Sequence, residues 1–470
     1  MDKIAPKPQE IRSLTGGALD YSICSLVTKP ELYEAMVQSF AAAGFDAESC
    51  EYLYADNTRG ADADGYQGLN RMIAAARGSY IILAHQDVLA LDTKAHLDRV
   101  LAEPTQAEPA WAVAGNAGCD SAGRLHSRIT DKHMYNGHLS SNAVAVLSLD
   151  ENFILLRRDA LIGFSHDLSG YHLYGTDIVQ QARLRGRGAF VIDFHLEHLG
   201  AGMIDQNFVV CMQAFQDKYK NIARAQQILT PSTRVSLGQP APSTARCQKK
   251  LARRTARTEG PAPLSYTLKR ISGGLADGIH RRLLGRPYLI DGHDVELGRD
   301  APLGLRRAVR RGRVLRDECA MVAKHLRADL PVVQLDAGIG LLTPSLRRAI
   351  GPDQRILAVA ETASPELDLN LGRAGAPERT TLTLAGASLA EIVAQHGFEA
   401  GFALISTRAN DVLGQLQDGT LNSCRMLLLT LKPLELHAAG RTVGELLKAL
   451  THAGFQVLET KGAVLVAARG

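Results

Sequence analysis

From Tyr21 onward, strand-like and helix-like segments alternate along the chain. Apolar stretches over residues 21–28, 50–57 and 80–84 are separated by segments with helical signals, the first of which carries Pro30 in its first turn. The run Tyr80–Ala84 is apolar without alternation, which is typical of a strand covered on both faces of a parallel sheet. This order of elements predicts an α/β fold with a doubly wound parallel sheet.

The chain has 470 residues, more than one ordinary core holds, and a second α/β pattern begins near Leu305. We therefore predict two doubly wound domains. The predicted organisation is a tail over residues 1–20, a first domain over 21–228, a linker over 229–302 and a second domain over 303–470.

The composition excludes several classes of protein. No run of about 18 apolar residues is present, so a membrane-spanning helix is not expected. The N-terminus lacks the apolar segment of a secretory signal. The seven cysteines are scattered without CxxC pairs, which argues against zinc fingers and disulfide frameworks and favours a cytoplasmic protein.

The predicted linker is strongly basic. Between Arg246 and Arg316 there are 18 Lys/Arg against six Asp/Glu, a local charge of +12, after the Pro/Ser/Thr-rich stretch 230–246. One interpretation is a solvated connector. The other is a patch that binds an anionic membrane surface, with the protein peripheral at the inner membrane, or another polyanion. No RNA-binding signature with interleaved aromatic residues accompanies the charge, so nucleic acid is not an expected partner.

Two polar residues and an acid, His85-Gln86-Asp87, follow the buried strand. Ligands gather at the carboxyl ends of strands in open α/β sheets. His85 and Asp87 project together there if the chain stays extended, because side chains alternate along a strand. The competing interpretation is that Asp87 caps the next turn and His85 is a satisfied core histidine.

Ordered pieces from about Tyr21 to Gly202 resemble the glycosyltransferase-A (GT-A) superfamily, and more closely its bacterial branch that carries HQD in place of the usual aspartate-rich motif. The pieces are the first strand, the Asp-Asn pair at 56–57, GYQGLNRMIAAARGSYIILAHQDV, AVAGNAG, DENFILLRRDAL, FSHDLSGYHLYGTDIVQQARLRG and DFHLEHLG. The resemblance implies a GT-A domain that transfers a sugar, of hexosyl type, from a nucleotide-sugar donor. The implied acceptor is a bacterial surface glycan or a lipid-linked glycoconjugate.

The resemblance also implies a divalent metal ion, Mn²⁺ or Mg²⁺, which neutralises the leaving nucleotide diphosphate. Asp87 would be its anionic ligand. His198 would be a late ligand, with His195 as the competing choice that spacing cannot separate. His85 either replaces the first acid of the family's acid-x-acid motif, which favours Mn²⁺, or contacts donor ribose or phosphate.

Further roles follow from the same resemblance. The residues implied to contact the donor are Thr28, Asp56, Asn57, Asn70 and His85. Asp150 and Glu151 begin a strand and would shape the acceptor site. Asp177, which opens a helix, would be the general base that accepts the proton of the acceptor hydroxyl. Helix caps and turns are the plain alternatives for these acidic and amide residues.

The second α/β pattern resembles class I S-adenosylmethionine-dependent methyltransferases, and its first part resembles the FkbM-like branch. It begins with the strand and glycine-rich turn PVVQLDAGIG, continues with ILAVAE, and closes with a hairpin turning at Lys461-Gly462. The residues implied to bind S-adenosylmethionine are Asp336, Gly338, Gly340 and Glu361.

The chain departs from the FkbM-like pattern at the fourth strand. There, ALISTRANDV lacks the lysine and aspartate of that family, and Glu361 lies one residue late. A degenerate domain kept for packing or partner binding is therefore as plausible as a working methyltransferase. The leading prediction is a metal-dependent glycosyltransferase fused to a methyltransferase-like domain. The alternatives are a bifunctional sugar transferase and O-methyltransferase, and a non-catalytic scaffold.

Overall fold

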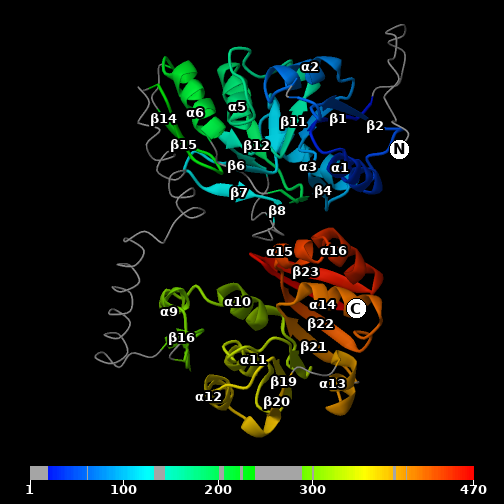
Figure 1. The fold of residues 1–470 in the computed structure, drawn as a ribbon, viewed down its shortest axis with the longest axis vertical. Helices are drawn as coiled ribbons and strands as arrows, with labels where there is room; N and C mark the ends of the chain where they lie inside the picture. The colour runs from blue at the N-terminus through cyan, green and yellow to red at the C-terminus, as the bar shows by residue number, and fades with distance from the viewer. Residues whose placement is uncertain are drawn as a thin grey trace.

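The chain folds around two seven-stranded sheets, one from each half of the sequence (Figure 1). The computed structural model describes residues 19–60, 62–131, 143–200, 206–222, 226–238, 288–298, 301–384, 388–398 and 400–469. Most of the predicted N-terminal tail and most of the basic linker, including its proposed membrane contact, lie outside these residues. In these ranges, no helix combines the length and the apolar character needed to cross a membrane.

The N-terminal unit, residues 19–238 as described, is built on a sheet of mixed direction. In spatial order its strands are β2 (Cys50–Asp56), β1 (Tyr21–Val27), β3 (Tyr80–Ala84), β11 (Phe153–Arg157), β5 (Val113–Gly115), β12 (Ala189–Val191) and β9 (Val144–Ala145). The first three pair in parallel, as the sequence predicts. However, β11 runs antiparallel to β3 and β5, and β9 runs antiparallel to β12. The prediction of a wholly parallel sheet is wrong, because periodicity reports burial and not strand direction.

Helices and short strands complete this unit. The helices are α1 (Pro30–Ala42), α2 (Gln67–Ala75), α3 (Lys94–Val100), α4 (Ala102–Ala107), α5 (Tyr174–Leu184) and α6 (Gln206–Tyr219), with a 3₁₀ turn η1 (Arg158–Ala160). One three-stranded sheet has the order β10 (Ser148–Leu149), β6 (Ala117–Cys119) and β7 (Leu125–Ser127). A second has the order β4 (Val88–Ala90), β13 (Leu196–His198) and β8 (Ile129–Asp131). A hairpin of β14 (Gln226–Leu229) and β15 (Arg234–Leu237) follows α6.

The central strand β3 is buried on both faces, as its apolar run predicts. Ile81 and Leu83 pack into one hydrophobic core, and Ile82 packs into the other core, with Phe153 and Trp111. This division follows from the alternation of side chains along a strand. The first polar side chains of this segment therefore come where the strand ends, at the carboxyl edge of the sheet.

The folded units extend into the predicted linker from both sides. Val235 and Leu237 in β15 are fully buried in the core that contains residues of α6. On the other side, Tyr288 and Val295 are buried in the C-terminal core. The first domain therefore extends beyond residue 228, and the second begins before residue 303. The sequence did not predict this, because the buried apolar residues lie within a composition that otherwise indicates a connector.

The C-terminal unit, residues 288–469 as described, has a sheet in the order β20 (Thr380–Leu384), β19 (Ile356–Ala360), β18 (Val332–Gln334), β21 (Phe402–Ser406), β22 (Cys424–Thr430), β24 (Val464–Arg469) and β23 (Phe455–Lys461). Numbered along the unit, this order is 3-2-1-4-5-7-6, and the last strand, β24, is antiparallel to its neighbours. The order of elements along the chain is the one that carries the class I resemblance, and β23 and β24 form the predicted terminal hairpin.

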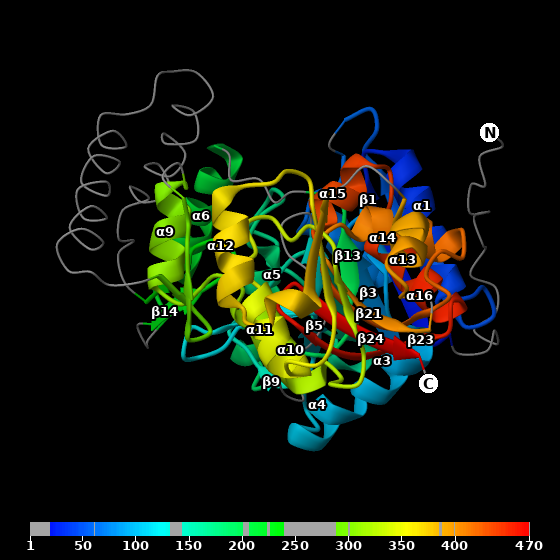
Figure 2. The same cartoon turned by 90° about the horizontal axis from the view of Figure 1, so that it is seen from below.

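The remaining elements of this unit are helices and one small hairpin. They are β16 (Tyr288–Ile290), β17 (His293–Val295), α9 (Leu303–Arg310), α10 (Arg316–His325), α11 (Thr343–Ile350), α12 (Pro365–Arg373), η3 (Pro377–Arg379), α13 (Leu389–Gln395), α14 (Ala409–Gln417), α15 (Pro433–Ala438) and α16 (Val443–His452). The two units meet where α15 and α16 lie against the β4-β13-β8 sheet (Figures 1 and 2).

Replacing Phe153 by alanine tests the N-terminal core. Because Phe153 is fully buried, we expect Phe153→Ala to lower the free energy of unfolding by about 3–5 kcal/mol. Urea denaturation followed by the fluorescence of Trp111, the chain's single tryptophan, reports on this unit alone. Leu184→Ala, at a side chain that is 63% exposed, is the control and should change stability by less than about 0.5 kcal/mol. Equal effects of the two substitutions would contradict this core.

Candidate functional site

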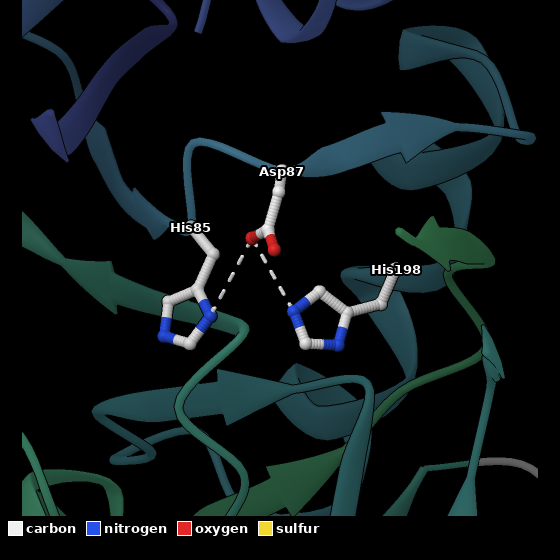
Figure 3. Close-up of side chains that lie close together, drawn as sticks. All are labelled: His85, Asp87 and His198. Atoms are coloured by element: carbon white, nitrogen blue, oxygen red, sulfur yellow. Dashed lines mark ion pairs between the residues drawn. The ribbon is translucent and has the colours of Figure 1, made fainter. Parts of the chain in front are cut away.

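His85, Asp87 and His198 converge at the carboxyl end of β3 (Figure 3). Asp87 Oδ1 lies 3.3 Å from His198 Nε2 and 3.9 Å from His85 Nδ1. In the described part of the chain, these three form the one group of His, Cys, Asp and Glu side chains close enough to hold a metal ion together. The side chains are 38%, 19% and 16% exposed for His85, Asp87 and His198, so the cluster has an open side.

Strand pairing brings these residues together. Asp87 lies in the turn between β3 and β4, and β4 pairs antiparallel with β13 so that Val88 faces His198. The backbone N–H of Leu199 also donates a 2.9 Å hydrogen bond to the Asp87 carbonyl oxygen. The histidine is therefore held beside the aspartate by main-chain contacts.

His195 lies outside the cluster. Its ring is buried, and its Nε2 lies 2.8 Å from the hydroxyl oxygen of Thr130. Burial holds the pKa of His195 well below its ordinary value. It is a satisfied core histidine, and the structure favours His198 where the sequence left both choices open.

Gln86, which sequence reasoning did not single out, links the cluster to the end of β1. Its Oε1 accepts hydrogen bonds of 2.8 Å from the backbone N–H groups of Thr28 and Lys29. Its Nε2 donates a 2.7 Å hydrogen bond to the Thr28 hydroxyl. Thr28, a predicted donor contact, is thus bound to the turn that carries His85 and Asp87. In the sequence, the feature that could have indicated a role for Gln86 was its position between two candidate metal ligands.

Gly200 is a second residue that sequence reasoning missed. A Cβ atom at this position would overlap the Asp87 carboxylate oxygen Oδ2. The glycine therefore leaves the space that the carboxylate occupies, and any larger side chain must displace Asp87.

The contact between Asp87 and His198 shifts both pKa values. Burial by itself raises the pKa of Asp87, but the His198 hydrogen bond and the nearby imidazoles outweigh it and lower that pKa. For His198, burial lowers the pKa, but Asp87 outweighs burial and raises it. Each group thus favours the charged form of the other. A metal cation can take the place of the proton that lies between His198 and Asp87.

The donor atoms indicate which metal ions fit. Imidazole nitrogen suits first-row transition metals, whereas Mg²⁺ prefers an all-oxygen shell. Two imidazoles and one carboxylate therefore fit Mn²⁺ better than Mg²⁺ among the two predicted ions.

Tyr174 connects the cluster to the predicted acceptor side. Its hydroxyl lies 3.0 Å from His85 Nε2 and donates a 3.2 Å hydrogen bond to the Glu151 carbonyl oxygen. Burial, followed by the charge of Asp150, raises the pKa of Glu151 to about 8. A carboxyl group with such a pKa can exchange a proton near neutral pH.

The prediction that Asp150 and Glu151 begin a strand is wrong. Both residues lie in the turn before β11. Asp150 Oδ1 accepts hydrogen bonds from the Asn152 backbone N–H at 3.0 Å and the Asn152 amide at 2.7 Å. Asp150 therefore orders this turn and fixes the neighbouring Glu151.

Asp177 does not lie at an accessible site. It is fully buried, and its carboxylate accepts hydrogen bonds from the Ser165 N–H and hydroxyl and from Tyr219 at 2.8, 2.7 and 2.6 Å. Burial raises its pKa against the effect of these hydrogen bonds. The prediction of Asp177 as general base is corrected, because an acceptor hydroxyl cannot reach a carboxylate enclosed by these contacts.

Two predicted donor-binding amides are also engaged within the protein. The Asn57 side chain pairs with the backbone of Ala63 through both amide ends, at 2.7 and 3.1 Å. The Asn70 side chain pairs with the backbone of Phe164 in the same way, at 2.9 and 2.8 Å. These amides brace loops, so neither prediction is supported. Asp56 differs, because it is exposed at the carboxyl end of β2.

In the C-terminal unit, Arg408 bridges the two acids predicted to bind S-adenosylmethionine. Its Nη1 lies 3.5 Å from Asp336 Oδ1 and 3.4 Å from Glu361 Oε1. Gly338 and Gly340 adopt φ values of +56° and +74°, as a tight turn requires. The predicted residues therefore lie together, but a guanidinium joins the acids.

No family model matches the chain. A curated protein of Fuscovulum blasticum named "ATP synthase subunits region ORF 6" is 33% identical over 241 residues, which are 50% of this chain and 96% of that protein. The chain belongs to the family of that protein. The name of this ORF 6 family describes a genomic position and states no activity.

Several solved structures have a partial likeness to this chain, and some of them are named as methyltransferases. The pyocyanin biosynthetic protein PhzM is 19% identical, with 50% of this chain and 86% of that chain covered and a TM-score of 0.26. A tRNA (m1A22) methyltransferase of Streptococcus pneumoniae in complex with S-adenosylmethionine is 16% identical, covers 33% and 72%, and has a TM-score of 0.26. An O-methyltransferase family protein of Burkholderia thailandensis is 13% identical, with 34% and 57% covered and a TM-score of 0.26.

We expect the full-length protein to bind S-adenosylmethionine weakly or not at all. Arg408 pairs with the acid that would hold the ribose, and the acidic fourth-strand segment is missing. Isothermal titration calorimetry measures the affinity, with Arg408→Ala as the companion variant that releases both acids. Binding by the unaltered protein at a Kd near 1 μM, about −8 kcal/mol, would contradict this expectation.

Proposed function

We propose that this protein is a metal-dependent glycosyltransferase that moves a sugar from a nucleotide-sugar donor to a surface glycan or lipid-linked acceptor. The proposal rests on the cluster of His85, Asp87 and His198. It offers two imidazoles and one carboxylate at the carboxyl end of a central strand, where ligands of α/β sheets gather. The ordered motifs that resemble the GT-A superfamily supply the reaction class.

Asp87 and His198 would hold the metal ion, and His85 would complete its protein ligands on the open side. When bound, a divalent ion supplies positive charge to a diphosphate leaving group. Asp56 is exposed at the end of β2, next to β1, and would meet the donor nucleotide. Gln86 would keep the turn in place through Thr28.

Glu151 is the general base that we propose in place of Asp177. Its raised pKa suits a group that accepts a proton near neutral pH. Tyr174, which contacts both His85 and the Glu151 carbonyl oxygen, links the main chain at Glu151 to the metal cluster. The acceptor hydroxyl would approach from this side.

A second candidate is methyl transfer from S-adenosylmethionine by the C-terminal unit, in a bifunctional enzyme. The class I strand order and the glycine turn after β18 favour it. The bridge from Arg408 to Asp336 and Glu361 opposes it. A non-catalytic scaffold is the third candidate, and the metal cluster with its open side speaks against it.

Asp87→Ala tests the metal assignment. We expect the unaltered protein to bind a nucleoside diphosphate such as UDP or GDP with a strong dependence on Mn²⁺, and the variant to lose that dependence because the anionic ligand is gone. Thermal-shift and calorimetric titrations with and without Mn²⁺ measure it. Asp92→Ala is the control, since the side chains of Asp92 and Asp87 are 21% and 19% exposed and Asp92 lies outside the cluster. Metal-independent nucleotide binding by the unaltered protein would refute the assignment.

Glu151→Gln and Asp177→Asn form a matched pair that tests the base. We expect Glu151→Gln to slow metal-dependent donor turnover by about 10²–10⁴-fold, because an amide cannot accept the proton. Asp177→Asn should keep turnover but lower the free energy of unfolding by about 1–3 kcal/mol, since its amide opposes hydrogen-bond donors. Release of nucleoside diphosphate and urea denaturation give the two readings. The reverse pattern would return the base to Asp177.

A further inference from the structure

Strand β13 presents consecutive residues to two different parts of the protein. His198 points toward Asp87 in the metal cluster (Figure 3). Glu197, the preceding residue, points to the opposite side because side chains alternate along a strand. Glu197 is fully buried, and it is covered there by the C-terminal unit.

The Glu197 carboxylate accepts three hydrogen bonds from the C-terminal unit. Oε1 accepts from His437 Nε2 at 2.7 Å and from the Val443 N–H at 2.9 Å. Oε2 accepts from the Gly444 N–H at 3.1 Å. Val443 and Gly444 open helix α16, where backbone N–H groups have no partner within the helix and favour a negative charge. The N-terminal unit therefore supplies the anion that this helix terminus requires.

Apolar contacts surround these hydrogen bonds. Leu91, which follows β4, packs against the core of the C-terminal unit. A Cβ atom at Gly444 would lie 3.2 Å from Leu91 Cδ2, so the start of α16 approaches β4 closely. Helix α15 contacts β8, the third strand of the small sheet. The C-terminal unit thus contacts this sheet at β13, at β8 and at Leu91 after β4.

We propose that the C-terminal unit positions His198 for metal binding by holding β13 through Glu197 and His437. This inference rests on the proposed metal-binding function of the cluster. β13 is only three residues long, so a shift at Glu197 moves the adjacent His198. Glu197 and His437 are positioning residues, because both lie on the side of β13 opposite the metal ligands.

The proposal gives the C-terminal unit a role that requires no bound cofactor. Two independent domains in tandem would leave the metal affinity unaffected by changes at the contact between the units. A positioning unit couples the two, because the hydrogen bonds to Glu197 limit where His198 can lie. The metal affinity of the N-terminal site therefore measures whether the coupling exists.

His437→Ala in the full-length protein tests the proposal. It removes one donor to Glu197 from the far side of β13 and leaves all three metal ligands in place. We expect Mn²⁺ alone, titrated by calorimetry, to bind about tenfold more weakly, the size of effect seen when groups that orient metal ligands are removed. His437→Gln keeps an N–H donor and should restore most of the affinity.

His325→Ala is the matched control. His325 pairs with Glu459 at 2.6 Å within the C-terminal unit, and its side chain is 16% exposed, as is that of His437. This variant should bind Mn²⁺ like the unaltered protein even if its melting temperature falls. Unchanged affinity in His437→Ala, or an equal loss in His325→Ala, would overturn the positioning role. Failure of the unaltered protein to bind Mn²⁺ would instead refute the metal site itself, and the inference with it.

Discussion

The antiparallel pairing of β13 with β4 is the contact on which the candidate site depends. It joins a strand that follows Asp87 to a strand that ends in His198, so two ligands far apart in the sequence lie next to each other. Backbone hydrogen bonds hold this antiparallel pairing. The site can therefore be built on a strand of three residues.

The parts of the site that the sequence predicts are those set by local rules. A strand buried on both faces must end before polar side chains appear. This rule predicts that His85 and Asp87 lie at the edge of the sheet, where the structure has them. The choice between His195 and His198 needed the partner strand. Alternation puts neighbouring residues on opposite faces, but only pairing with β4 determines which face meets the aspartate.

Most of the failures share one cause, which is a partner distant in the sequence. The exception is Asn57, whose partner Ala63 lies six residues away. Asp177 looks like an accessible acid until Tyr219 and Ser165 enclose it. Asn57 and Asn70 have ordinary polar surroundings in the sequence, yet each braces a loop. Conversely, the raised pKa of Glu151 comes from burial, which no short motif reports. Strand direction failed for the same reason, because β11 is reversed only in the context of its neighbours.

The buried carboxylate of Glu197 also restricts how the two halves of this protein can be exchanged or recombined. Swapping the C-terminal unit for a different domain leaves the Glu197 carboxylate covered but without the N–H donors that it now accepts from. Breaking one side of such a buried contact is far more damaging than replacing both sides together. A viable recombinant would therefore need a compensating change at Glu197. Without that change, the two halves must be inherited as a pair.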